Sequence, residues 1–261
     1  MVIANPAFGE TSTEVPGSRA DRNIGSNRRR SVTNTKRLTD TYFAPLSGTE
    51  AEGRSIVEIF PKAKLISGAG ATETVVKNVA SPEILHIATH GFFLEDPDSV
   101  PGNRSVSFTL AAGTALMRDN PLLRSGLAFA GANRKTRDKD DGILTALEAS
   151  GLNLWGTKLV VLSACDTGLG EIRNREGVYG LRRSFSIAGA ESLVMSLWPV
   201  SDRVTKELMT GYYANLKKGL GRGEALRQVL LSMIKRPTRK HPFYWASFIH
   251  SGEWANLDGK R

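Results

Sequence analysis

The sequence predicts a doubly wound α/β fold, in which a mostly parallel sheet is flanked by helices. The first observation is that short, apolar, β-rich runs alternate with segments of helical spacing. The second is that the runs at 84–89 (ILHIAT) and 158–164 (KLVVLSA) are typical of buried strands. The third is that a glycine closely follows each of these two runs, where a strand should end.

The N-terminal half begins with a strand at 2–4, which Asn5-Pro6 ends. Because this strand has no lead-in, we expect the chain to be part of a longer protein. Apolar residues at 49–60 follow one helical stripe after a Gly-Thr start, which predicts a helix. The same patterns predict a strand at 63–66, a helix at 72–79 and the strand at 84–89.

The C-terminal half starts with an irregular region at 94–142, which contains hairpin-like pieces at 105–112 and 122–131 and a mixed-charge loop at 134–142. Apolar periodicity then returns. The elements predicted from it are a helix at 144–152, the strand at 158–164, a helix at 177–188, a strand at 191–197, helices at 204–217 and 223–234, and a closing strand at 243–249.

We expect one domain over residues 1–261, with a basic, flexible loop at 10–44 inside it. That loop is rich in Ser, Thr, Asn, Arg and Gly and has little apolar content. Seven basic residues and one acid lie between Arg19 and Arg37, so this segment supplies +6 of the net charge of +9 and leaves +3 for the rest. A solvated loop is the first interpretation of this segment, contact with an acidic partner the second and nucleic acid the third.

Composition excludes several classes of protein. No run approaches the roughly 18 apolar residues of a membrane span, and the N-terminus lacks the pattern of a signal peptide. The single cysteine excludes an intramolecular disulfide and fits a reducing compartment. The four histidines have no metal-ligand spacing with it, and no phosphate-binding glycine motif is present. We therefore predict a cytoplasmic protein with no membrane contact, no metal and no cofactor.

Two residues at predicted strand ends could carry chemistry. His90 ends one buried strand and Cys165 ends another, and Gly91 directly follows the histidine. In parallel sheets, catalytic groups collect at the carboxyl ends of strands. A thiol attacks as thiolate, and a nearby imidazole can take its proton. The alternative is that Cys165 only fills the core, as we expect of His86, which lies mid-strand on the face of His90.

These residues lie in segments that resemble the CHAT domain, a caspase-like family that is often fused to TPR repeats and is related to separase. The segments are IATHGFF (87–93), VVLSACDTGLGE (160–171), EGVYGLRRSFSIAGAESLVMSLWPVSD (176–202), NPAFG (5–9), PLSGTEAEGRSI (45–56) and HPFYWASFIHSGEW (241–254). The resemblance implies a caspase-like sheet and a cysteine endopeptidase that cleaves a protein substrate through an acyl-enzyme. It implies His90 as general base, Cys165 as nucleophile, and backbone N–H groups of Gly91 and Cys165 as the oxyanion hole.

The resemblance also implies that an N-terminal TPR-type region or a partner protein activates the domain. The chain departs from the Gln-Ala-Cys-x-Gly signature of caspases, because Ser163-Ala164-Cys165-Asp166-Thr167-Gly168 stands there. Aspartate specificity is therefore not transferred.

A basic residue before the scissile bond is the specificity we expect, since a desolvated guanidinium needs a carboxylate partner. Asp202 is the first candidate, because the segment 197–202 resembles a separase segment whose pocket recognises arginine. Asp166, next to the nucleophile, is the second. The alternative for Asp202 is that it caps the helix near 204.

Two functions of other classes stay open at this stage. A caspase-like scaffold for protein assembly would keep the fold without proteolysis. A nucleic-acid-binding module would use the basic segment 19–37, although that segment has no interleaved aromatic residues.

Overall fold

The structure of the chain is a computed structural model that describes residues 1–9, 38, 41–94, 121–135, 140–163, 176–198 and 201–260. Several sequence predictions lie outside these residues. They are the hairpin-like piece at 105–112, nearly all of the loop at 10–44, and the site residues Cys165 and Asp166.

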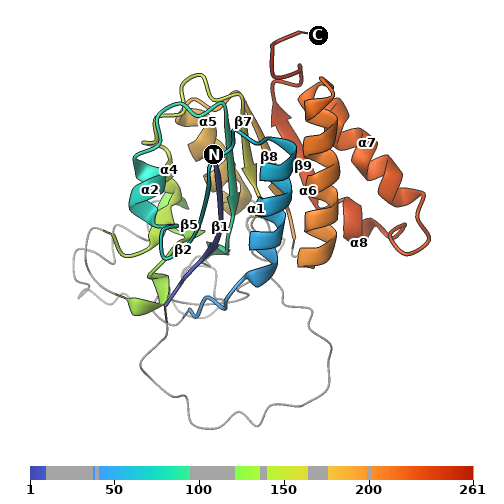
Figure 1. The fold of residues 1–261 in the computed structure, drawn as a ribbon. Helices are drawn as coiled ribbons and strands as arrows, with labels where there is room; N and C mark the ends of the chain where they lie inside the picture. The colour runs from blue at the N-terminus through green and yellow to red at the C-terminus, as the bar shows by residue number, and fades with distance from the viewer. Residues whose placement is uncertain are drawn as a thin grey trace, which may run out of the picture.

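A six-stranded, mostly parallel sheet lies at the centre of the fold, in the order β2-β1-β3-β7-β8-β9 (Figure 1). Its strands are β1 (Val2–Pro6), β2 (Leu65–Gly68), β3 (Ile84–Ala88), β7 (Leu159–Leu162), β8 (Ser192–Ser196) and β9 (Phe248–Gly252). All neighbouring pairs are parallel except β8 and β9, which are antiparallel. The predicted α/β fold class is confirmed.

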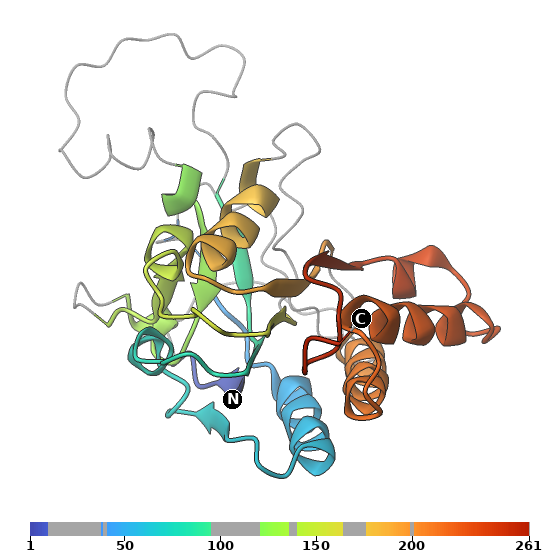
Figure 2. The ribbon, with the colours of Figure 1, turned by 90° about the horizontal axis from the view of Figure 1, so that it is seen from above.

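Helices cover both faces of this sheet, because successive strand residues point to opposite sides and both sides are apolar. On one face, Leu85 and Val160 belong to a core shared with α2 (Glu73–Lys77), α4 (Ala146–Ala149) and α5 (Glu176–Ile187). On the other face, Val161 and Val194 pack with α1 (Ser47–Ile59), α6 (Asp202–Lys217) and α7 (Arg222–Ile234). Figure 2 shows the two helical layers from above, with α1 and α6 on one side and α4 and α5 on the other.

Gly53 permits the close packing of α1 on the first strand. A Cβ added there would lie 2.7 Å from Leu65 Cδ1 and 3.2 Å from Ala4 Cβ. A larger residue would have to push the helix away from β1, since interiors are close-packed.

A second, smaller sheet follows His90 and was not predicted. It has the order β4-β5-β6, is antiparallel, and consists of β4 (Gly91–Phe93), β5 (Ser125–Ala128) and β6 (Ile143–Thr145). The predicted hairpin at 122–131 is wrong, because this stretch supplies one strand between two partners. The predicted helix at 144–152 is shorter than expected: its first residues form β6, and Thr145 then caps α4 in a capping box with Glu148.

The C-terminal prediction is partly wrong. The segment expected as one strand at 243–249 begins as the short helix α8 (Pro242–Trp245), and β9 starts only at Phe248. The helix is started by His241, whose side chain accepts the Phe243 N–H, and by Pro242 at the first helical position. Aromatic β-propensity was therefore overridden by a helix-start signal.

None of the helices in the described part of the chain is long and apolar enough to span a membrane.

Candidate functional site

The backbone of His90 is fixed where the two sheets meet. It lies two residues beyond the last residue of β3 and directly before β4. The Ala128 N–H of β5 donates to the His90 carbonyl at 2.9 Å. The neighbouring Thr89 hydroxyl donates to the Ala128 carbonyl. His90 is therefore held at the carboxyl edge of the parallel sheet, as the sequence predicted.

The ring of His90 is oriented by a backbone carbonyl. Its Nε2 lies 2.8 Å from the carbonyl oxygen of Ala44, and the residue is 1% exposed. A carbonyl only accepts hydrogen bonds, so Nε2 carries the proton in this bond. In the neutral ring Nδ1 then has the lone pair, and this is the nitrogen that can act as a base.

Two aromatic rings enclose the imidazole. The ring centroids of Phe8 and Phe43 lie 5.2 and 5.8 Å from that of His90. Both phenylalanines belong to a small apolar core with Phe92, which follows Gly91 in β4. This packing limits the orientations that the His90 ring can adopt.

Asn133 connects the segment that carries Ala44 to the rest of the fold. Its Oδ1 accepts the Phe43 N–H at 2.9 Å, and its Nδ2 donates to the carbonyls of Phe43 and Gly9, both at 2.9 Å. The residue is 3% exposed. Because Ala44 directly follows Phe43, Asn133 positions the carbonyl that orients His90.

Sequence reasoning missed both Ala44 and Asn133. A backbone carbonyl has no residue-type signature, and an asparagine after Gly131 looks like an ordinary turn residue.

The end of β7 lies beside the end of β3. The parallel register pairs Ile87 with Leu162, and the Ser163 N–H donates to the Ile87 carbonyl at 2.9 Å. Along the chain, His90 comes three residues after Ile87, and Cys165 three residues after Leu162. The predicted nucleophile Cys165 and the residue after it, Asp166, lie outside the described residues.

Gly91 occupies a specific position in the ladder between β4 and β5. Ala128 N–H bonds to the His90 carbonyl and Leu94 N–H bonds to the Arg124 carbonyl, so these two pairs are hydrogen-bonded. Hydrogen-bonded and non-hydrogen-bonded pairs alternate along antiparallel strands. Gly91, one residue after His90, is therefore at a non-hydrogen-bonded position, and its N–H points away from β5.

Asp202 lies between the beginnings of two helices. It is the first residue of α6, and the N-cap is Ser201, so the alternative that Asp202 itself caps the helix is wrong. A Cβ added at Gly48, the second residue of α1, would lie 2.3 Å from Asp202 Oδ2. The half-buried carboxylate thus packs against the first turn of α1, four residues after Ala44. Both helix N-termini favour a negative charge there.

His86, predicted to be a core residue, is fully buried. Its Nδ1 lies 3.0 Å from the Tyr213 hydroxyl of α6, and its Nε2 lies 3.2 Å from Glu52 Oε1 of α1. Burial raises the pKa of Tyr213 well above its usual value, so the phenol stays protonated and donates to His86. These contacts join both helices to β3, so His86 connects elements of the core.

In the described part of the chain, no group of three or more His, Cys, Asp or Glu side chains is placed to hold a metal ion.

Comparisons with known proteins cover nearly the whole chain. A family model described as "CHAT domain" matches residues 1–253. The chain is also similar to tetratricopeptide repeat protein 28 of Homo sapiens and of Mus musculus, with 24% identity to each over 220 residues. Each match covers 83% of this chain and 9% of the relative, so the chain spans a small fraction of the length of these relatives.

Proposed function

This chain belongs to the CHAT domain family, a caspase-like family, and from that premise we propose that it is a cysteine endopeptidase acting through His90 and Cys165. The observation that carries the proposal is the hydrogen bond from His90 Nε2 to the Ala44 carbonyl at the carboxyl edge of the sheet. This bond leaves Nδ1 as the basic nitrogen, and β3, which leads to His90, pairs with β7, which leads to Cys165.

The proposed reaction starts with transfer of the Cys165 thiol proton to His90 Nδ1. The thiolate then attacks the carbonyl carbon of the scissile peptide bond, and the carbonyl oxygen becomes an oxyanion. His90 gives its proton to the leaving amine nitrogen as the carbon–nitrogen bond breaks, which leaves a thioester on Cys165. A water molecule, deprotonated by His90, attacks this thioester and releases the acid product and the thiol.

Two features of the described residues support this sequence of steps. The Ala44 carbonyl stabilises the imidazolium that forms when His90 takes a proton, because it faces the Nε2–H in either state. The Gly91 N–H points away from β5, so the ladder with β5 does not use it, and in this proposal it is the first oxyanion-hole donor. The Cys165 N–H is the second donor in this proposal.

Cleavage after a basic residue is the proposed specificity. Asp202 supports it, because its half-buried carboxylate lies against the α1 segment that follows Ala44, at the same edge of the sheet as His90. Asp166 is the second proposed carboxylate.

Regulation by a larger protein is part of the proposal. The similar tetratricopeptide repeat proteins are far longer than this chain. We therefore propose that an N-terminal TPR-type region or a partner protein controls access of the protein substrate.

The test is a profile of a peptide library, or of denatured proteins, incubated with the wild-type chain and with Cys165→Ala. Cleavage by the wild type that is lost in Cys165→Ala and His90→Ala is expected, with His241→Ala as a matched control because His241 is exposed and distant in sequence from the site. Cleavage that survives in folded Cys165→Ala would contradict the proposal. Absence of any cleavage, with an unreactive thiol, would favour the scaffold alternative.

A further inference from the structure

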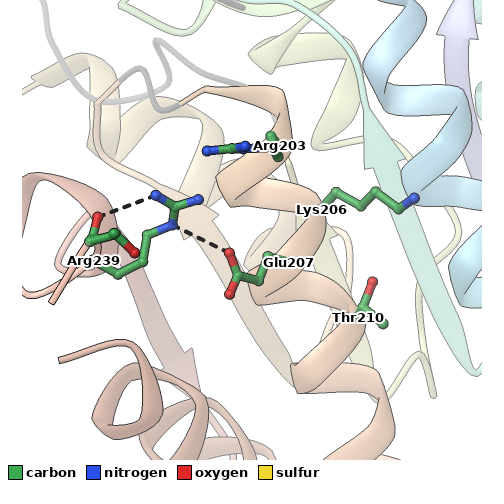
Figure 3. Close-up of a pocket in the computed structure, with 6 residues that line it drawn as sticks. Arg203, Lys206, Glu207, Thr210 and Arg239 are labelled. Atoms are coloured by element: carbon green, nitrogen blue, oxygen red, sulfur yellow. Dashed lines mark hydrogen bonds and ion pairs between the residues drawn. The ribbon is translucent and has the colours of Figure 1, made fainter. Parts of the chain in front are cut away.

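An open pocket of about 520 Å³ lies beside α6, away from the ring of His90. Arg203, Lys206, Glu207 and Thr210 of α6 line it, and Thr238 and Arg239 from the segment between α7 and α8 complete it. Figure 3 shows the guanidinium groups of Arg203 and Arg239 on the same side of the helix, near Glu207, with Lys206 extending to the other side.

The residues that line this pocket carry a net positive charge, because three are basic and one is acidic. Glu207 is the acidic residue among the described residues that line the pocket, and its carboxylate is already paired with two arginines. Arg236 contacts Oε1, and Arg239 Nε lies 3.3 Å from Oε2. Arg203 is exposed, and no carboxylate of the described residues lies within ion-pair distance of it. An anion in the pocket would give Arg203 an ionic partner that the described residues do not supply.

The guanidinium of Arg239 is held in place before any ligand binds. Its Nη1 donates to the Thr238 carbonyl at 3.2 Å, and its side chain is 12% exposed. It also stacks over the Tyr244 ring, 5.5 Å from the centroid. A fixed guanidinium loses little conformational entropy when it binds a carboxylate, which it can do through two parallel hydrogen bonds.

The pocket is connected to the candidate active site by a short path of contacts. His90 bonds to Ala44, the α1 segment that follows packs at Gly48 against Asp202, and Arg203 is the next residue of α6. The pocket therefore begins in the first turn of α6, the turn whose Asp202 packs against the segment that follows Ala44.

We propose that the pocket of Arg203 and Arg239 binds an acidic segment of the protein substrate, outside the residue at the cleaved bond. This inference rests on the proposed peptidase function for its biological meaning, but binding itself does not need catalysis. Single-stranded nucleic acid is disfavoured, because Arg239 lies over the Tyr244 ring, on a face where a base would stack.

The experiment measures fluorescence anisotropy of a short, labelled, glutamate-rich peptide with the full chain carrying Cys165→Ala. The same peptide with glutamine in place of glutamate is the neutral probe, and a short DNA duplex is the third probe. We expect the acidic peptide to bind at least about tenfold more tightly than the neutral one, and Arg203→Glu to remove most of that difference.

Lys62→Glu is the matched control, because Lys62 is exposed and follows the C-terminal end of α1, and the substitution changes the net charge by the same amount as Arg203→Glu. It should change the Kd of the acidic peptide by less than about twofold, because screening weakens the effect of distant charges. Equal binding of the acidic and neutral peptides, equal effects of Arg203→Glu and Lys62→Glu, or a preference for the DNA duplex would each overturn the inference. If the acidic peptide binds as expected but Cys165 cleaves nothing, the proposed function fails while the binding surface stands.

Discussion

Asn133→Ala should destabilise the fold and disturb His90 at the same time. The substitution removes three hydrogen bonds and leaves the Phe43 N–H, the Phe43 carbonyl and the Gly9 carbonyl without these partners. A net contribution of about 1 kcal/mol for each bond gives a loss of about 3 kcal/mol. For a chain of this size, such a loss lowers the Tm by roughly 6–12 °C.

The assay is thermal and denaturant unfolding of the wild type and the variant, with Asn153→Ala as control. Asn153 is exposed, and its side chain has one long contact, 3.4 Å from Ser81 Oγ, so its loss should change stability by less than about 0.5 kcal/mol.

Asn133→Asp separates hydrogen bonding from shape. Aspartate has nearly the same volume and can still accept the Phe43 N–H, but it cannot donate to the two carbonyls and places an oxygen against them. We expect it to be destabilised at least as much as Asn133→Ala. If Asn133→Asp has the same unfolding free energy as the wild type, the Asn133 side chain stabilises the fold through packing alone and the reasoning is refuted.

The remaining predictions concern packing, pH and specificity. Gly53→Ala should lower the free energy of unfolding by about 1–3 kcal/mol, because the added Cβ would press on β1 and Leu65. Gly70→Ala should lower it by less than about 0.5 kcal/mol in the same assay, because no atom lies closer than 3.5 Å to the added Cβ. The Lys158 ammonium holds the pKa of Glu191 below its usual value of 4.5. The ionised Glu191 carboxylate therefore stabilises the fold above pH 4.5, and this stabilisation is lost as the pH falls through the lowered pKa. Unfolding measured from pH 7 downward should therefore show a smaller acid-induced loss in Glu191→Gln than in the wild type, and equal losses would contradict the assignment. Asp202→Asn, which keeps the shape of the side chain, should reduce cleavage after Arg and Lys in a peptide library, and an unchanged preference would remove Asp202 from the specificity pocket.

The strands that position the site could be predicted because each is a short apolar run. The run at 191–197 contains β8 (Ser192–Ser196), and the run at 84–89 contains β3 (Ile84–Ala88). Both are buried on both faces, so the hydrophobic signal does not depend on distant context.

The smaller sheet could not be predicted in this way. Its strands are three or four residues long and pair across long intervals, as Gly91 does with Leu127. Such strands are too short to show a periodicity of their own. At the C-terminus, the aromatic residues 243–245 favoured a strand, but Pro242 places them in a helix.

The candidate site could likewise be predicted only in part. The location of His90 at the end of a buried strand followed from the sequence and is confirmed. The Ala44 carbonyl lies 46 residues away along the chain, and its role depends on backbone geometry that no residue type encodes. The catalytic roles of His90, Gly91 and Cys165 stay predictions.

The most direct test of the dyad is the rate at which iodoacetamide alkylates Cys165 at neutral pH in the wild type and in His90→Ala. The chain has one cysteine, so all label reports this residue. A free thiol, with a pKa of about 8.5, is only a few per cent thiolate at neutral pH. We predict that Cys165 reacts at least about tenfold faster than such a thiol and that His90→Ala removes this advantage, because the base is gone. Equal rates in the wild type and folded His90→Ala would contradict the account.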